Sequence, residues 1–346
     1  MKSFFTSFGM WWATPIIGVI GALAASYLNW PLPWIIGSML AVIVVRCLGW
    51  RVGEIPNGRL SGQWMIATSI GLHFTPVVLQ QVLGHFVMMI FAAFLTLLLA
   101  LLGIEFMRRR GMDLTTAFFA FMPANFSEMI QSGIRHKANV SQIAAAHSVR
   151  LVLIVLCVPP AFFLMEKMLP TAAHARLPAD WYWLAPLLLG GALMAMLWKR
   201  CELPNPWMFG PMVFCGFFTA SFDLQTALPV ELSHYGQLMI GCALGGYFDR
   251  QFFRASPTFL LSVALFTLTM IGCTVALALG MGLLLGFPPM TMALGMMPGS
   301  STEMYLTAEA LNLGVGIVTA MQIMRLVVVM LCAEPVHKLW LKRISR

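Results

Sequence analysis

The chain has 346 residues, of which 60% are hydrophobic and only 10% are charged. A soluble domain carries roughly 25% charged residues, so this composition excludes a soluble protein. The formal net charge of +8 does not indicate nucleic-acid binding, because the sequence has no DNA- or RNA-binding motif and its Lys and Arg residues gather between apolar runs, as in membrane proteins.

Apolar runs of about 20 residues, long enough to cross a bilayer as helices, recur from end to end. In the first half we expect helices at 11–28, 33–50, 60–80, 84–107 and 139–165, with a broken segment at 121–129. In the second half we expect them at 182–200, 206–222, 235–250, 256–285 and 313–336, with a broken segment at 296–304. The third segment of each half is short and rich in glycine, which favours a break there too.

The two halves repeat each other. PLPW at 31–34 matches PNPW at 204–207, GQWMI at 62–66 matches GQLMI at 236–240, FMPANFSEM at 121–129 matches MMPGSSTEM at 296–304, and RLV recurs at 150 and 325. The offset drifts only from 173 to 175 residues. The sequence therefore predicts membrane repeat 1 at 1–170, a linker at 171–181 and membrane repeat 2 at 182–346.

Basic residues predict opposite orientations for the two repeats. In repeat 1 they follow the second and fourth helices (Arg51, Arg59, Arg108, Arg109, Arg110), and in repeat 2 the first and third (Lys199, Arg200, Arg250, Arg254). The loop at 167–182 departs from this pattern, since it should lie outside yet carries Lys167 and Arg176. The positive-inside rule then gives two inverted-topology repeats of about five transmembrane helices each, with a broken or re-entrant helix per repeat and both termini in the cytoplasm. Inverted repeats with broken helices are typical of secondary transporters.

The broken segments carry polar residues at membrane depth, where irregular backbone is tolerated only inside protein or beside a wet cavity. Their candidate substrate-binding residues are Pro123, Asn125, Ser127, Glu128, Pro298, Ser300, Ser301, Thr302 and Glu303. The prolines interrupt helices, and the hydroxyl and amide residues can begin a second half-helix whose N-terminus favours an anion. The alternative is that Ser or Thr with Glu simply caps a helix.

Arg150 and Arg325 each lie in the middle of an apolar helix, where a charge should face a cavity or a partner. They could pair with Glu128 or Glu303, or bind a substrate anion through both ends of the guanidinium. His147 and Gln322 precede the arginines by three residues, on the same helix face. His147 could titrate in a proton-coupled step, or it could be an interior histidine with its hydrogen bonds satisfied.

Neither a metal site nor a cofactor is expected. The seven cysteines form no CxxC pair, and the seven histidines do not cluster at ligand spacing. We therefore expect no enzyme activity. The expected partners are the lipid bilayer and a small solute, with possible H⁺ or Na⁺ coupling, no nucleic acid and a possible homo-oligomer.

With these blocks assembled, the chain resembles the AbrB family of bacterial membrane proteins over nearly its whole length. The resemblance rests on the Pro-Trp helix openings, the GQxMI segments, MPGSSTEM at 297–304 and MQIMRL at 321–326. Family members carry the labels of regulators of AidB expression or putative ammonia monooxygenases. Their usual break is Pro-Gly-Gly followed by small residues, whereas this chain has Pro-Gly-Ser and Pro-Ala-Asn, and a glutamate where many relatives have a small residue.

Three functions compete at this point. The leading one is a permease of a small, anionic solute in the bacterial inner membrane, working by alternating access. The family label implies a membrane regulator of gene expression as the alternative. A membrane oxygenase is the weakest, because it would need a metal site that the sequence lacks.

Overall fold

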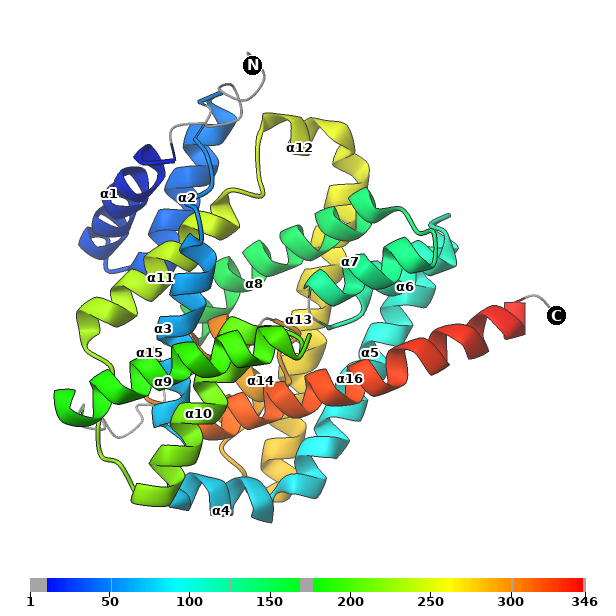
Figure 1. The fold of residues 1–346 in the computed structure, drawn as a ribbon. Helices are drawn as coiled ribbons and strands as arrows, with labels where there is room; N and C mark the ends of the chain where they lie inside the picture. The colour runs from blue at the N-terminus through cyan, green and yellow to red at the C-terminus, as the bar shows by residue number, and fades with distance from the viewer. Residues whose placement is uncertain (1–10, 51, 125, 169–176, 300, 345–346) are drawn as a thin grey trace. The chain divides into compact units, whose positions relative to one another are not determined.

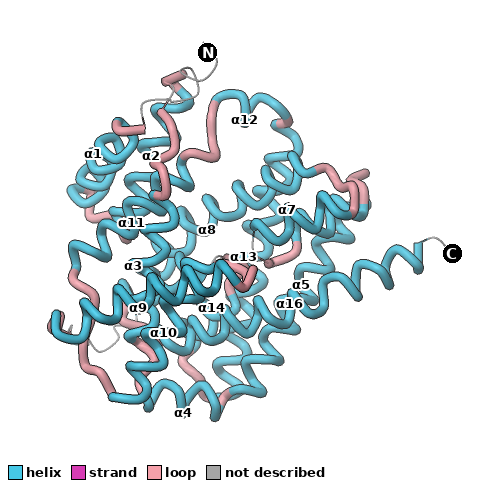
Figure 2. The backbone as a smooth tube through the Cα atoms, viewed as in Figure 1, coloured by secondary structure: helices cyan, strands magenta, loops and turns pink. Residues whose placement is uncertain are grey.

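The computed structural model describes residues 11–50, 52–124, 126–168, 177–299 and 301–344. All regular structure in these ranges is helical, as Figure 2 shows. The first half contains α1 Ala13–Tyr27, α2 Pro33–Cys47, α3 Gly58–Leu72, α4 Pro76–Gly84, α5 Phe86–Arg109, α6 Leu114–Phe121, α7 Phe126–Arg135 and α8 Val140–Met168. The second contains α9 Trp181–Arg200, α10 Pro206–Phe222, α11 Val230–Gly245, α12 Arg250–Ala255, α13 Pro257–Leu285, α14 Pro289–Met296, α15 Ser301–Ala310 and α16 Val315–Ile344 (Figure 1).

Within the described ranges, five helices are long and apolar enough to cross a bilayer: α5, α8, α9, α13 and α16. The pair α3 and α4, bent by 84°, passes the same test as one broken span. The expected all-α, multi-pass membrane fold is thereby confirmed. The opposite orientation of the repeats and the number of crossings in each stay predictions.

Local sequence explains where several helices begin and end. Pro33 and Pro206 open α2 and α10, where a missing backbone N–H costs nothing. The carboxylate of Asp113 accepts a hydrogen bond from the backbone N–H of Thr116 at 3.0 Å and so caps α6. Gly286, with φ +64°, ends α13 in the left-handed conformation that glycine adopts without strain.

The helices form two compact units that do not coincide with the two sequence repeats. Unit 1 comprises 1–80, 159–255 and 310–312, and unit 2 comprises 81–158, 256–309 and 313–346. Each unit therefore takes segments from both halves of the chain. The expected linker at 171–181 separates two duplicated sequences and does not predict which helices pack together, so it stays a prediction. Residues 169–176 lie outside the described residues.

In unit 1, α1 packs against α2, α11 against α2 and α3, and α10 against α3 and α9. The crossing of α1 and α2 depends on two glycines. A Cβ atom added to Gly21 would lie 2.3 Å from the carbonyl oxygen of Gly37, and one added to Gly37 would lie 2.3 Å from that of Gly21. Small residues at such positions let membrane helices approach closely enough for extensive van der Waals contact.

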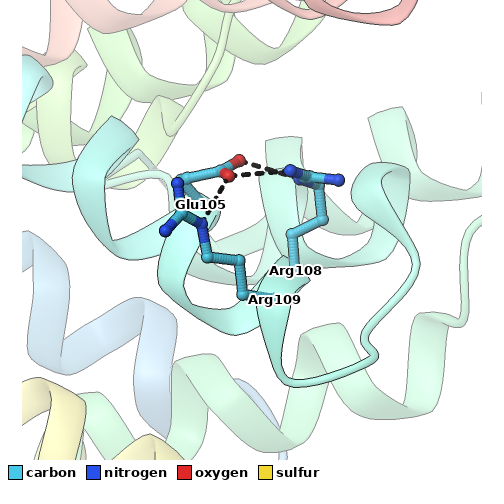
Figure 3. A network of polar contacts seen from close by, with 3 residues as sticks. All are labelled: Glu105, Arg108 and Arg109. Atoms are coloured by element: carbon cyan, nitrogen blue, oxygen red, sulfur yellow. Dashed lines mark hydrogen bonds and ion pairs between the residues drawn. The ribbon is translucent and has the colours of Figure 1, made fainter. Parts of the chain in front are cut away.

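In unit 2, α16 and α6 pack along α5, and α14 packs against α13 and α16 (Figure 1). The core gathers buried side chains from α5, α6, α7, α8, α13 and α16, with Phe118 and Phe119 fully buried at its centre. At the end of α5, the carboxylate of Glu105 binds Arg108 at 2.7 Å and Arg109 at 2.9 Å, as Figure 3 shows. Both broken segments belong to this unit.

Candidate functional site

The two broken segments are pairs of short helices separated by a few residues of irregular chain. The helix α6 ends at Phe121 and α7 begins at Phe126, while α14 ends at Met296 and α15 begins at Ser301. Pro123 and Pro298 lie in these gaps and are buried. Each gap thus leaves the last carbonyl groups of one helix and the first N–H groups of the next without intrahelical partners.

The polar residues expected in the breaks differ in their surroundings. Thr302 and Glu303 are buried in the first turn of α15, with Ser301 half-buried before them, and Glu128 is half-buried in the first turn of α7. Asn125 and Ser300 lie outside the described residues, as does the side chain of Ser127.

Arg150 is buried in unit 2 beside the first break and is only 9% exposed. Its Nη1 donates to the carbonyl oxygens of Met122 at 3.2 Å and Phe121 at 3.4 Å, which end α6. Its Nη2 donates to Nδ1 of His147 at 2.8 Å. His147 itself is buried and, through Nε2, bonds the carbonyl oxygen of Phe119 at 2.9 Å. A cation at the C-terminal end of a helix is favourable, because the free carbonyls there carry partial negative charge.

Arg325 is buried beside the second break and is only 4% exposed. Its Nη1 donates to the carbonyl oxygen of Met297, and its Nη2 to that of Gly299 at 2.7 Å. Gln322 is fully buried next to it. The Nε2 of Gln322 donates to the carbonyl oxygens of Leu294 at 2.8 Å, Met297 at 3.1 Å and Gly295 at 3.2 Å.

The two breaks use the same hydrogen-bond pattern. His147 bonds the carbonyl 28 residues before it, and so does Gln322. Arg150 and Arg325 likewise each donate to the carbonyl 28 residues before them. In the repeat alignment His147 matches Gln322 and Arg150 matches Arg325. In the structure, both members of each matched pair bond a carbonyl at the same distance along the chain.

The arginines do not form the ion pairs that the sequence left open. Neither guanidinium lies within ion-pair distance of a carboxylate of a described residue, Glu128 and Glu303 included. The Nε atoms of both arginines are buried and find no hydrogen-bond acceptor among the described residues. Two like charges are therefore buried in one unit. Both bond backbone carbonyls, Arg150 also bonds His147, and the Nε–H group of each is left without an acceptor among the described residues.

A narrow hollow, too tight for a water molecule, lies beside Arg325 in unit 2. Its wall includes Met89, Ala92, Ala93 and Thr96 of α5, together with residues of α14 and α16. Sequence reasoning did not single out Thr96 or this face of α5. The signal was available, because Met89, Ala92, Ala93 and Thr96 follow the helical spacing of one face. In this conformation the space is too narrow to hold a small molecule.

No group of three His, Cys, Asp or Glu residues in the described ranges could hold a metal ion. The charged groups buried at the breaks include the two guanidinium groups of Arg150 and Arg325. Guanidinium groups present donors in a planar fork that suits carboxylates and related oxyanions. The N-terminal turns of α7 and α15 follow the breaks directly, and helix N-termini also favour negative charge.

These helices and breaks define a multi-pass α-helical membrane protein with interrupted helices. The chain belongs to the AbrB family: the family model described as "Transition state regulatory protein AbrB" matches residues 34–341. It is also similar to "Uncharacterized protein YhjN" of Bacillus subtilis (strain 168), with 23% identity over 174 residues, a match that covers 46% of this chain and 44% of that protein. The chain thus spans less than half the length of this curated relative, while the family expected from the sequence is confirmed.

Proposed function

We propose that the protein is a secondary transporter of a small anionic solute and that the solute binds at the two helix breaks of unit 2. The observation that carries the proposal is the pair of buried arginines, Arg150 and Arg325, each bonded to backbone carbonyls and neither paired with a carboxylate of a described residue. A charge buried without a counter-ion costs several kcal/mol. A bound anion would supply the missing charge and acceptors for the Nε–H groups.

The repeated geometry supports transport rather than a fixed structural role. In transporters built from inverted repeats, discontinuous helices place half-helix ends around a site near the bilayer midplane. Here Arg150 and Arg325 mark equivalent places in two repeats, and both breaks belong to one compact unit. Alternating access then follows if the narrow space beside Arg325 widens to one side of the membrane at a time.

The remaining parts of the proposal follow from the charge pattern and from transport itself. The excess of Lys and Arg in alternate loops favours a bacterial inner membrane with both termini in the cytoplasm. We propose no chemical reaction for the protein: it would move its solute unchanged, with an ion gradient as the energy source, in the lipid bilayer and without a nucleic-acid partner.

The proposal is tested by thermal unfolding of the detergent-purified protein against acetate, lactate, succinate, citrate, phosphate, ammonium and methylamine. A ligand that binds only the folded protein raises the melting temperature. We expect at least one anion, and neither amine, to stabilise the wild type. The variants Arg325→Gln and Glu303→Gln test the site, since both residues lie at the second break.

Arg109→Gln is the matched control, because it also removes an arginine of unit 2 but one whose side chain is 76% exposed. We expect the stabilising anion to act on Arg109→Gln as on the wild type and to lose its effect on Arg325→Gln. Stabilisation by an amine instead of an anion, or equal stabilisation of Arg325→Gln and wild type, would contradict the proposal.

A second function is favoured by the family description, which names a regulatory protein. The protein would then alter gene expression from the membrane, either by moving a metabolite or by contacting a partner. The two routes are separated by deleting the gene and restoring it with the Arg325→Gln variant. Restoration of expression by a variant that no longer binds the anion would favour a direct regulatory role, whereas failure to restore it would favour transport.

A further inference from the structure

The partners of His147 determine where its ring proton lies. A guanidinium can only donate hydrogen bonds, so Nδ1 of His147 must accept the bond of 2.8 Å from Arg150. A carbonyl oxygen can only accept, so Nε2 must donate to Phe119 at 2.9 Å. The ring in this conformation is therefore neutral, with its single proton on Nε2.

The equivalent residue of the second repeat cannot take part in the same chemistry. Gln322 donates to the carbonyl oxygen of Leu294, as His147 does to that of Phe119. Its Oε1, however, is buried without a hydrogen-bond donor among the described residues. An amide does not titrate, so only the first break contains a group that could gain a proton next to its arginine.

A second proton on His147 would change how Arg150 is held. The proton would occupy Nδ1 and remove the acceptor that now binds Nη2 of Arg150. It would also place two positive charges about 3 Å apart, a distance at which like charges repel strongly in a low dielectric. Both effects release the guanidinium of Arg150 from His147 and increase the attraction of the site for an anion.

Arg150 is the charged residue in direct contact with the ring of His147. The ring lies between Arg150 on its own helix, the carbonyl oxygen of Phe119 on α6 and the ring of Phe126 on α7, whose centroid is 5.9 Å away. Charged and titratable groups on the neighbouring elements of unit 2 include Asp113 before α6, Glu128, Arg135 and His136 on α7, Glu303 and Glu309 on α15, and Arg325 and His337 on α16. Among the charged groups of the described residues, Arg150 is the one bonded to the His147 ring, at 2.8 Å.

We propose that His147 carries the coupling proton of the anion site: a proton on Nδ1 releases Arg150 to bind the anion, and the two ions are carried together. This inference rests on the proposed transport function and names its coupling ion as H⁺. Because binding of two ligands is linked reciprocally, an anion bound at Arg150 also favours protonation of His147. One proton on His147 adds one positive charge, and one anionic group at Arg150 adds one negative charge. The proposed stoichiometry is therefore one proton for each anionic charge bound at Arg150.

The first test is nitrogen NMR of ¹⁵N-histidine-labelled protein in lipid nanodiscs at neutral pH, without ligand. The His147 signals are those missing from His147→Gln. If that variant does not fold, a variant that keeps His147 as its single histidine gives the same assignment. We expect the shifts of a neutral ring protonated on Nε2. A charged ring, or a neutral ring protonated on Nδ1, would overturn the proposal whatever the protein transports.

The second test measures uptake of lactate, succinate and citrate into proteoliposomes with the membrane potential clamped at zero and protein-free vesicles as the baseline. At one proton per monoanion, an acid exterior one pH unit below the interior supports about tenfold accumulation, since one pH unit corresponds to a factor of ten. We expect this accumulation with the wild type and an accumulation ratio near one with His147→Gln.

The outcomes separate coupling from transport. Wild-type uptake that does not respond to the pH gradient, or accumulation that persists in His147→Gln, would overturn proton coupling while transport stands. Absence of uptake of every anion would count against the proposed function itself, and the NMR result would then decide whether His147 holds Arg150 as inferred.

Discussion

Arg150 and Arg325 hold the two helix breaks of unit 2 in the same way, each donating a hydrogen bond to the carbonyl oxygen 28 residues before it in the chain. The accepting carbonyls belong to Met122 and Met297, at the ends of α6 and α14. An arginine in this position neutralises the partial negative charge of a helix end and still has donors to spare. The same contact can therefore stabilise the break and present positive charge to a solute.

Replacing either arginine by lysine should weaken anion binding although the charge is kept. Lysine is a compact point charge and cannot donate to two carbonyls and an anion in one plane. We expect the dissociation constant for the stabilising anion to rise at least about tenfold, which corresponds to about 1.4 kcal/mol. Titration calorimetry on Arg150→Lys and Arg325→Lys measures this, with Arg109→Lys as the control that should bind like the wild type.

Gln322 should be replaceable by histidine but not by leucine. Leucine would leave the carbonyls of Leu294 and Gly295 without their side-chain donor, at a cost of about 1–3 kcal/mol for a buried unsatisfied group. Histidine can donate from Nε2, as His147 does at the equivalent position. Thermal unfolding in detergent should show a clear loss of melting temperature for Gln322→Leu and a smaller one for Gln322→His. Equal losses for the two variants would count against a role for this hydrogen bond.

The crossing of α1 and α2 should not tolerate a methyl group at Gly37. An added Cβ would lie 2.3 Å from the carbonyl oxygen of Gly21, so the helices would have to separate. Overpacking of this kind costs about 1–3 kcal/mol. Gly272 of α13 is the matched control, because nothing lies within 4 Å of its added Cβ. We expect Gly37→Ala to lower the melting temperature and Gly272→Ala to leave it unchanged or slightly higher.

The ion pairs of Glu105 should matter little for stability. Its carboxylate binds Arg108 and Arg109 across one helical turn, but the three side chains are between 26% and 76% exposed. Exposed pairs of this kind contribute about 0.2–1 kcal/mol and are screened by salt. Glu105→Gln should therefore shift the melting temperature slightly at low ionic strength and not at high ionic strength. A large loss at both ionic strengths would assign the pair a structural role that its exposure does not suggest.

Much of the helical framework could be predicted from the sequence, because long apolar runs indicate membrane helices. Proline, glycine and charged residues indicate where those helices end. The expected segments at 33–50, 182–200 and 256–285 correspond to α2, α9 and α13. The breaks at Pro123 and Pro298 were predictable for the same reason, since proline and small polar residues stand out in an apolar chain.

The partners of the site could not be predicted. The acceptors of Arg150, Arg325 and Gln322 are backbone carbonyls, and every residue has one, so side-chain identity gives no signal for them. The sequence suggested Glu128 and Glu303 as ion-pair partners because it shows charges but not distances. The division into two interleaved units also depends on which helices pack together, which a repeat boundary does not reveal.

The most direct test of the account is flux of the stabilising anion across proteoliposome membranes, measured as counterflow of labelled anion into vesicles loaded with the unlabelled one. The account predicts saturable counterflow with the wild type and with Arg109→Gln, and its loss in Arg325→Gln. Absence of counterflow with folded wild-type protein, or undiminished counterflow with Arg325→Gln, would contradict the claim that the paired breaks of unit 2 carry an anion.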